Sequence, residues 1–342
     1  MSSNPVSVGV FLTNQHKPGR DLVAALDEQY RMVRFARDNG WDSIWAGQHY
    51  LPETLSMPQP VPFLARLSAE AGEMRVGIGI LLLVLQNPLH IAETYASLDA
   101  ITGGRLIFGV GLGYRDIEYN AFGIERSEVV RRFEANLDIV SRLWTEETVT
   151  ADLPWCQLDE ARLLVKPVQQ PRPAIWMAAN ADAAVRRAAR LSDAWLVNPH
   201  ATHETIERQI ELFNTTRAEA GLPAPAESPA MREIFCAPTR EEAVESVRPY
   251  LEAKYSAYAD WGQDKALPGD ENFRIDFDEL AAGRFVIGTP DDCLEQLVRW
   301  RDVHGINHFV LRTEWVGMPT ELALGSMQLL TDEVLPVLRD GS

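Results

Sequence analysis

The amino-acid sequence predicts an α/β fold, a (β/α)8 TIM barrel in which parallel strands alternate with helices. Two observations favour this fold. About eight short apolar segments recur along the 342 residues, and segments with helical spacing of apolar residues separate them. The length fits one domain or two, and the unbroken alternation favours a single barrel with insertions. We therefore expect one domain over residues 1–342, with insertions after strands four and seven.

Short apolar runs bounded by turn residues predict the strands, and apolar residues at helical spacing predict the helices. The expected strands cover residues 6–12, 43–46, 75–82, 105–110, 174–178, 193–197, 231–237 and 307–312. The expected helices cover residues 21–39, 60–71, 88–101, 127–144, 181–191, 205–220 and 240–259, with two more that start at residues 289 and 320.

Three segments do not fit the alternation and are expected to be insertions, at about residues 111–126, 148–165 and 260–284. The first contains an irregular stretch over 115–126, and the second has the pattern of a small hairpin. The third is polar and carries scattered aromatic residues. Because a long segment without regular structure inside a compact domain is usually functional, we expect it to be a lid or binding loop.

Charge and cysteine content exclude several functions. Lys and Arg number 32 against 49 Asp and Glu, a net charge of −17, which repels nucleic acid and anionic lipid. Cys156, Cys236 and Cys293 have no metal-binding spacing and favour a reducing compartment. The sequence shows no signal peptide pattern and no apolar run of roughly 20 residues. We expect a cytoplasmic protein without a metal, a nucleic-acid partner or a membrane partner.

In a barrel, the carboxyl ends of the strands meet at one mouth. This places His49, residues 86–87, 111–115, 179–180, 198–200 and 312–315 together. The ordinary pKa of histidine, about 6.5, suits acid or base chemistry at neutral pH. A single histidine at a strand end can equally be a hydrogen-bonded loop residue, so the grouping carries more weight than His49 alone.

The glycine-rich sequence GVGLGY at residues 109–114 follows the fourth expected strand. A dinucleotide-binding loop would need a helix directly after it and an acidic residue about 20 positions later, and neither is clear. The glycines instead favour either the close approach of a flat ligand or a plain turn.

Four segments carry a resemblance to a known family. They are GWDSIWAGQHY at 40–50, RVGIGILLLVLQNPLHIAETYASLDAITGGRLIFGVGLGYRDIEYNAFG at 75–123, AIWMAANADAAVRRAARLSDAWL at 174–196 and IGTPDD at 287–292. In this order and spacing they resemble the bacterial luciferase-like monooxygenase family, whose members are flavin-dependent TIM barrels. The likeness extends over most of the chain.

The resemblance implies roles for residues at the barrel mouth. His49 falls at the family's catalytic histidine, and Gln48 replaces the acidic residue that precedes it there. Gly79 and Ile80 fall where the family backbone presses on the flavin ring, often through a cis peptide, here at Gly79–Ile80 or Ile80–Leu81. The remaining predicted cofactor-binding residues are Gln86, Asn87, Gly111, Arg115, Ala179, Asn180 and Ala183.

Two departures from the family concern the cofactor phosphate. Ala183 stands where the family often has a hydroxyl residue, and Leu112 stands at the position of an arginine. We expect Arg115 to replace the missing positive charge, and Asp182 to face solvent or to cap its helix. Residues Tyr50, Tyr114 and Trp315 are expected to shape the substrate pocket.

The resemblance implies a monooxygenase that takes reduced FMN from a separate reductase and uses O2 to oxygenate a small organic substrate, such as an aldehyde or ketone. It also implies a homodimer. Two alternatives stay open: an F420-dependent oxidoreductase that transfers hydride, and a non-catalytic flavin-binding protein. The negative net charge does not favour the oligoglutamate tail of F420.

Overall fold

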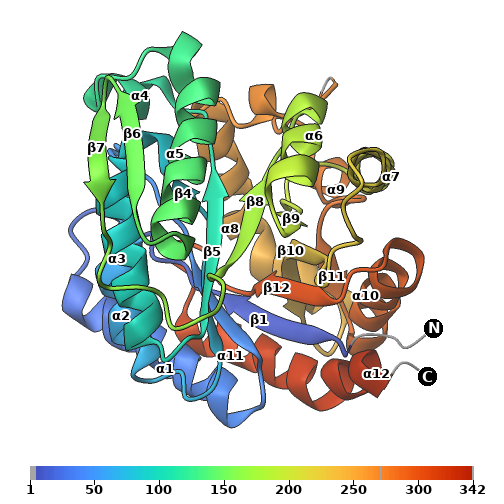
Figure 1. The fold of residues 1–342 in the computed structure, drawn as a ribbon. Coiled ribbons are helices and arrows are strands. Elements are labelled where there is room, and N and C mark those ends of the chain that lie inside the picture. The colour runs from blue at the N-terminus through green and yellow to red at the C-terminus, as the bar shows by residue number, and fades with distance from the viewer. Residues whose placement is uncertain (1–4, 270, 341–342) are drawn as a thin grey trace.

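A curled parallel sheet forms the centre of the computed structural model, which describes residues 5–269 and 271–340 (Figure 1). The strands are β1 (Ser7–Phe11), β2 (Ser43–Ala46), β3 (Arg75–Ile78), β4 (Leu81–Leu82), β5 (Leu106–Gly111), β8 (Ala174–Ala178), β9 (Ala194–Leu196), β10 (Pro229–Cys236), β11 (Val286–Gly288) and β12 (His308–Arg312). Their hydrogen-bonded order is β11-β10-β12-β1-β2-β3-β5-β8-β9, and β4 pairs with β5.

The two sides of this curled sheet meet between β9 and β10. Val197, directly after β9, forms a parallel bridge with Ala230 of β10. Its amide donates to Pro229 O at 3.1 Å, and its carbonyl accepts from Met231 N at 2.8 Å. The architecture is therefore an α/β fold consistent with the expected (β/α)8 barrel.

Helices cover the outside of the sheet (Figure 1). The α-helices are α1 (Leu22–Asp38), α2 (Pro60–Ser68), α3 (Pro88–Ile101), α4 (Asp116–Ala121), α5 (Val129–Thr145), α6 (Asp182–Leu191), α7 (His203–Glu219), α8 (Arg240–Asp260), α9 (Phe277–Ala281), α10 (Pro290–His304), α11 (Thr320–Leu329) and α12 (Leu335–Asp340). Short 3-10 segments occupy Leu83–Leu85, Arg126–Glu128 and Asp264–Ala266, and a π-helical segment, Leu330–Val334, joins α11 to α12.

Capping side chains fix where several helices begin. Asp21 accepts from the amides of Val23 and Ala24 at the start of α1. Thr289 and Asp292 form a reciprocal capping box at the start of α10, which ends at Gly305 in the left-handed region with φ 69°. These contacts satisfy backbone groups that a helix end would otherwise leave unpaired.

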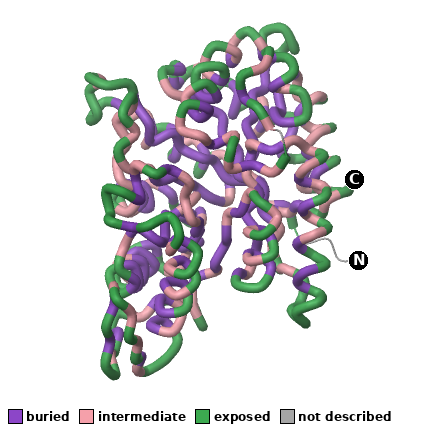
Figure 2. The backbone as a smooth tube through the Cα atoms, turned by 90° about the horizontal axis from the view of Figure 1, so that it is seen from above, coloured by how far each residue is buried: buried purple, intermediate pink, exposed green. Residues whose placement is uncertain are grey.

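Large side chains fill the interior of the sheet at its amino-terminal end. Trp45 and Trp176 stack with ring centroids 5.1 Å apart, and both rings contact the edge of His308. A Cβ at Gly77 would lie 2.3 Å from the Trp45 ring, so glycine is needed there. Buried segments lie at the centre of the molecule and exposed ones around it (Figure 2). The open space of the barrel is thereby restricted to its carboxyl-terminal mouth.

The structure confirms the eight expected strands and corrects their details. The strand expected over 75–82 is interrupted after Ile78, and the Gly79–Ile80 peptide bond is cis, one of the two expected positions. The strand β11 was not expected, because its three residues directly precede a strong helix start. It extends the sheet by pairing with the end of β10.

The expected insertions contain more regular structure than the sequence indicated. The irregular stretch predicted over 115–126 includes the helix α4, and residues 260–284 contain α9. The predicted hairpin is confirmed as the antiparallel pair β6 (Val149–Leu153) and β7 (Cys156–Ala161). It lies at the edge of the molecule outside the central sheet (Figure 1). Within the described residues, no helix combines the length and apolar character needed to cross a membrane.

Candidate active site

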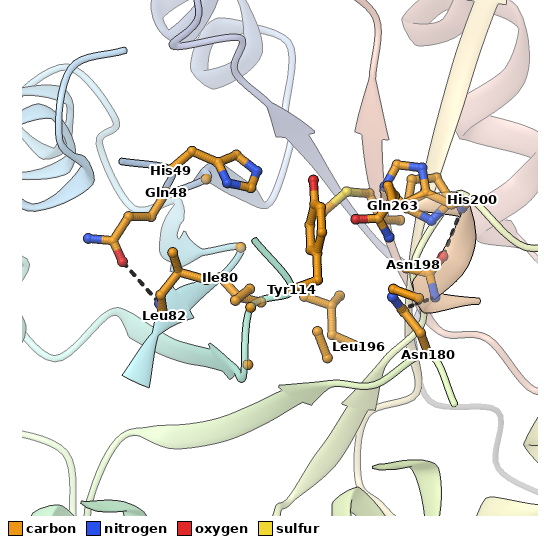
Figure 3. Close-up of a pocket in the computed structure, with 18 of the residues that line it drawn as sticks. Gln48, His49, Ile80, Leu82, Tyr114, Asn180, Leu196, Asn198, His200 and Gln263 are labelled. Carbon is orange, nitrogen blue, oxygen red and sulfur yellow. Dashed lines mark hydrogen bonds between the residues drawn. The ribbon is translucent and has the colours of Figure 1, made fainter. Parts of the chain in front are cut away.

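A cavity of about 290 Å³ lies at the mouth formed by the carboxyl ends of the strands. Loops that follow six strands (β1, β2, β3, β5, β8 and β9) supply most of its wall, and ten of its residues are labelled in Figure 3. The lining includes Phe11, Asn14, Gln15, residues 47–49, Met57, Gly79, Ile80, Leu82, residues 111–114, 178–181 and 198–200, Ala184, Leu196, Met231, Lys254, Tyr258, Gln263, Ala266 and Arg312.

Glu118 holds the side chain of His49. The carboxylate, only 1% exposed, lies 3.1 Å from His49 Nδ1. The same oxygen accepts from the amide of Tyr50 at 2.8 Å and lies 3.5 Å from Arg115 Nη1. Because Nδ1 is occupied, Nε2 is the ring nitrogen left for a ligand in the cavity. Glu118 thus supplies a carboxylate beside His49, although Gln48 occupies the position of the family's acidic residue.

Gln48 forms no hydrogen bond with the imidazole of His49; its side chain hydrogen-bonds to neighbouring loops instead. Its Oε1 accepts from the amide of Leu82 at 2.9 Å (Figure 3). Its Nε2 donates to Tyr50 Oη at 3.1 Å and to Gln59 Oε1 at 3.0 Å. Gln48 therefore fastens the loop after β2 to β4 and leaves His49 to Glu118.

Tyr50, Gln86 and Asn87 are among the predicted site residues that do not line the cavity. Tyr50 packs edge-on against Phe122, with centroids 4.8 Å apart, and its hydroxyl accepts from Gln86 Nε2 at 2.8 Å. Asn87 caps α3 by accepting from Leu89 N at 2.9 Å, the alternative role that a residue before Pro88 suggests. The structure thus places Tyr50 and Gln86 in a layer behind the cavity lining, where Tyr50 also contacts Gln48, and leaves Asn87 exposed at the start of α3.

Arg115 does not reach the place where a phosphate was expected. Its guanidinium is buried, donates to the carbonyls of Tyr50 at 2.7 Å and Leu51 at 3.1 Å, and lies over the Trp261 ring at 4.6 Å. These contacts hold the loop that carries His49. Arg115 is absent from the cavity lining, which corrects the prediction that it supplies a charge there.

One wall of the cavity is formed by backbone and small or apolar side chains. Gly79, Ile80 and Gly111 all line it. A Cβ at Gly111 would come within 2.6 Å of Ile80 Cδ1, so glycine lets Ile80 lie flat against β5. Tyr114 stands between His49 and the far side of the cavity (Figure 3), and its hydroxyl has no partner among the described residues. This wall fits a flat aromatic ring system.

The predicted phosphate-binding turn lies at the start of α6. Ala179 and Asn180 line the cavity, but Ala183 faces outward and does not. Ala181 takes the N-cap position without a side-chain hydrogen bond, so the first amides of the helix are left for an anion. Asp182 forms an ion pair with Arg208 at 2.7 Å, which keeps its carboxylate away from this position.

Another wall of the cavity contains Arg312, which the sequence placed at the mouth, together with charged residues that the sequence did not single out. Lys254 of α8 and Arg312 of β12 line the cavity beside His200. Glu233 of β10 is fully buried behind them, where it pairs with Lys254 and accepts from Trp315 Nε1. Trp315 therefore lies outside the cavity lining and acts on it through Glu233.

Burial controls the protonation of this wall. It lowers the pKa of His200 well below 6.5, and the nearby charges of Lys254 and Arg312 lower it further. Burial also lowers the pKa of Lys254, although Glu233 opposes the shift. His200 is therefore a neutral imidazole at neutral pH.

The segment over 260–284 contributes to the same cavity. Gln263 and Ala266 line it, and the Trp261 ring lies 5.4 Å from the His49 ring. Glu271 anchors the segment: it pairs with Arg284, and both side chains are less than a tenth exposed. The expected lid is thus folded against the cavity, with a buried ion pair at its base.

Comparisons with known proteins agree with this geometry. A family model described as luciferase-like monooxygenase matches residues 6–305. A limonene 1,2-monooxygenase from Rhodococcus erythropolis is 26% identical over 338 residues, which cover 97% of this chain and 86% of that protein. A 4-hydroxyprotoasukamycin monooxygenase from Streptomyces nodosus subsp. asukaensis is 30% identical over 163 residues. That alignment covers 47% of this chain and 44% of the relative, so the match spans less than half of either protein.

Solved structures share the architecture. A monooxygenase from Streptomyces bottropensis has a TM-score of 0.85 at 26% identity and covers 96% of this chain and 99% of its own. The oxygenating constituent of 3,6-diketocamphane monooxygenase from Pseudomonas putida, in complex with FMN, has a TM-score of 0.79 at 18% identity, with 97% and 98% covered. An F420-dependent secondary alcohol dehydrogenase also reaches 0.79 at 18% identity, with 98% and 100% covered. The last two likenesses show the fold alone.

Proposed function

Because the chain belongs to the luciferase-like monooxygenase family, we propose that it is a flavin-dependent monooxygenase. It uses reduced FMN from a separate reductase, together with O2, to oxygenate a small organic substrate. The observation that carries the proposal is His49, which a buried carboxylate orients at a cavity with one flat, glycine-rich wall. We also propose a homodimer, which family likeness supports, a single domain, which the alternation of strands and helices supports, and a cytoplasmic location, which the spacing of the cysteines supports.

The residues of the cavity fit a flavin. The wall of Gly79, Ile80 and Gly111 would hold the ring system, and the free amides at the start of α6, beside Ala179 and Asn180, would hold the phosphate. When bound, the reduced flavin supplies the electrons that activate O2. The protein's own residues must then orient the substrate, exclude water and move protons.

His49 is the proposed acid and base. Its Nε2 faces the ligand space, and Glu118 stabilises a positive charge on the ring when a proton arrives. Glu118 acts through His49 and is therefore a positioning residue. Trp261 and Tyr114 pack around the imidazole at 5.4 and 5.9 Å between ring centroids, which limits the access of water to it.

The first test concerns the cofactor. Purified protein is titrated with reduced FMN under anaerobic conditions, and with F420, while intrinsic fluorescence is followed. We expect saturable binding of reduced FMN. Tight binding of F420 with none of reduced FMN would replace the proposal with hydride transfer, and binding of oxidised flavin without any turnover would favour a non-catalytic flavoprotein.

The second test concerns His49. A panel of terpenes, ketones and aldehydes is incubated with reduced FMN and isotopically labelled O2, and mass spectrometry detects labelled product. We expect His49→Ala to lower product formation by about 10²–10⁴-fold, the usual contribution of a positioned acid or base. The control His90→Ala alters an exposed histidine of α3 and should react as the parent does. Equal rates for His49→Ala and parent would remove His49 from the mechanism.

A further inference from the structure

Arg312 is a buried cation without a protein anion. Only 5% of its surface is exposed, and it lines the cavity at the end of β12. Its Nε donates to the carbonyl of Glu314 at 3.2 Å. Across the described part of the chain, no acceptor bonds to Nη1 or Nη2, and no carboxylate pairs with the guanidinium. A charge in this position requires an acceptor from elsewhere, because burying an unpaired guanidinium costs free energy.

Lys254 places a second positive charge in the same wall. Its ammonium pairs with Glu233, whose other oxygen accepts from Trp315 Nε1. Glu233 is fully buried and does not line the cavity, whereas Lys254 does. The pair therefore presents the Lys254 side chain to the cavity and keeps the Glu233 carboxylate buried behind it. Glu233 and Arg312 are neighbours in the β10–β12 register, yet both Glu233 oxygens already have donors.

This arrangement contrasts with the rest of the molecule. The chain carries a net charge of −17, but the wall that includes His200 presents the Arg312 guanidinium and the Glu233-paired amine of Lys254 beside the neutral His200 ring. A guanidinium fork with both terminal nitrogens free matches a planar oxyanion, which it can bind through two parallel hydrogen bonds.

We propose that Arg312 and Lys254 form an oxyanion subsite, which binds a carboxylate or an ionised enol or phenol of the organic substrate. This inference rests on the proposed function, since it names the class of substrate that the same cavity accepts. The substrate would place its charged end on Arg312 and Lys254 and its uncharged part toward His49. The polar edge of a reduced flavin ring presents the same planar chemistry, and the experiment distinguishes the two sources.

The test measures binding without any flavin, so it does not depend on oxygenation. Isothermal titration calorimetry in an amine buffer compares 2-naphthoate with its uncharged analogue 2-naphthalenemethanol. We expect the parent to bind the acid about tenfold or more tightly than the alcohol, since a charge-assisted pair contributes about 1.5–3 kcal/mol. Arg312→Gln should abolish this preference. Arg190→Gln, which removes the same charge from an exposed position on α6, should retain it.

Two further variants separate charge from folding. Arg312→Gln removes a buried charge that no carboxylate pairs with, at the loss of one hydrogen bond to Glu314 O, so its melting temperature should equal or exceed that of the parent. The double variant Lys254→Met with Glu233→Gln removes both members of the buried ion pair, so neither is left without the other, and the preference for the acid should again fall. Equal binding of acid and alcohol by the parent would overturn the proposal. So would an Arg312→Gln variant that loses only affinity for reduced FMN, because that result assigns the cations to the flavin edge. Neither outcome changes the separate test of oxygenation.

Discussion

Glu118 and His49 form the most specific contact of the candidate site, although 69 positions separate them in the sequence. The sequence pattern placed His49 at a strand end, next to the uncharged Gln48. The pattern could not identify the carboxylate that contacts His49 in place of Gln48. That carboxylate belongs to Glu118, which lies in a helix of six residues, too short to show helical periodicity. The sequence placed Arg312 at the mouth but did not identify Lys254 and Glu233, because pairing between distant residues leaves no mark in local spacing.

The first residue-scale prediction concerns stability. Glu118→Gln keeps the shape of the side chain but removes the charge that accepts from His49, Tyr50 N and Arg115. We expect a loss of about 1–3 kcal/mol in the free energy of unfolding, the usual range for a buried hydrogen bond to a charged group. Urea unfolding measures it.

The matched control for this change is Glu128→Gln. Glu128 pairs with Arg131 at the surface, with side chains 41% and 60% exposed, and such pairs contribute about 0–1 kcal/mol. If Glu118→Gln were no more destabilising than Glu128→Gln, the Glu118 carboxylate would not be the anchor of the His49 loop.

At the scale of elements, the segment over 260–284 combines cavity contacts with an anchor of its own. Glu271 pairs with Arg284 and also accepts from the amide and hydroxyl of Thr202, at 3.2 and 3.3 Å. The base of the segment is thereby attached to the start of α7. The composition of this segment predicted a binding loop, but its anchor depends on a contact that only the folded chain provides.

We expect Glu271→Gln to loosen this segment while the rest of the fold persists. Breaking a buried ion pair lowers stability by about 3–5 kcal/mol. Here the loss should lower the free energy of local opening of residues 260–284 rather than that of global unfolding. Trypsin should therefore cleave after Lys265 and Arg274 at least about tenfold faster than in the parent, as followed by mass spectrometry of the fragments. The exposed change Glu279→Gln should leave the rate unchanged, and equal rates in both variants would contradict the anchor.

The missed strand β11 has a related explanation. Val286, Ile287 and Gly288 directly precede the capping box of α10, so the helix signal dominates the pattern and three residues are too few to show alternation. The eight expected strands were predictable because each lies in an apolar run bounded by turn residues. Their order in the sheet follows from the right-handed crossover rule for parallel strands.

For the whole molecule, a polar cluster at the amino-terminal end of the barrel links strands that are distant in the sequence. Glu227 lies 2.6 Å from Arg75 Nη1 of β3 and 3.2 Å from His308 Nδ1 of β12. His308 Nε2 lies 2.8 Å from Ser43 Oγ of β2. Burial alone would raise the pKa of Glu227, but the hydrogen bonds with His308 and Arg75 lower it to about 2.

This shift predicts how stability depends on pH. A carboxyl whose folded pKa lies below its ordinary value stabilises the fold above about pH 4.5 and loses that contribution as the pH falls toward about 2. Between about pH 6 and about pH 3, the parent should lose about 2 kcal/mol more of its unfolding free energy than Glu227→Gln does. Urea unfolding at both values measures this. Glu219→Gln, an exposed change, should follow the parent, and parallel curves for Glu227→Gln and parent would contradict the role of the cluster.

The single bridge between Val197 and Ala230 has a consequence for ligand binding. The neighbouring pair β8–β9 has three register partners, whereas β9 and β10 meet through this one bridge and two backbone hydrogen bonds. Leu196 and Met231 line the cavity from opposite sides of the junction. A ligand that contacts both side chains would complete the circumference of the sheet from within. Occupancy of the site and closure of the barrel are then thermodynamically linked, so each stabilises the other.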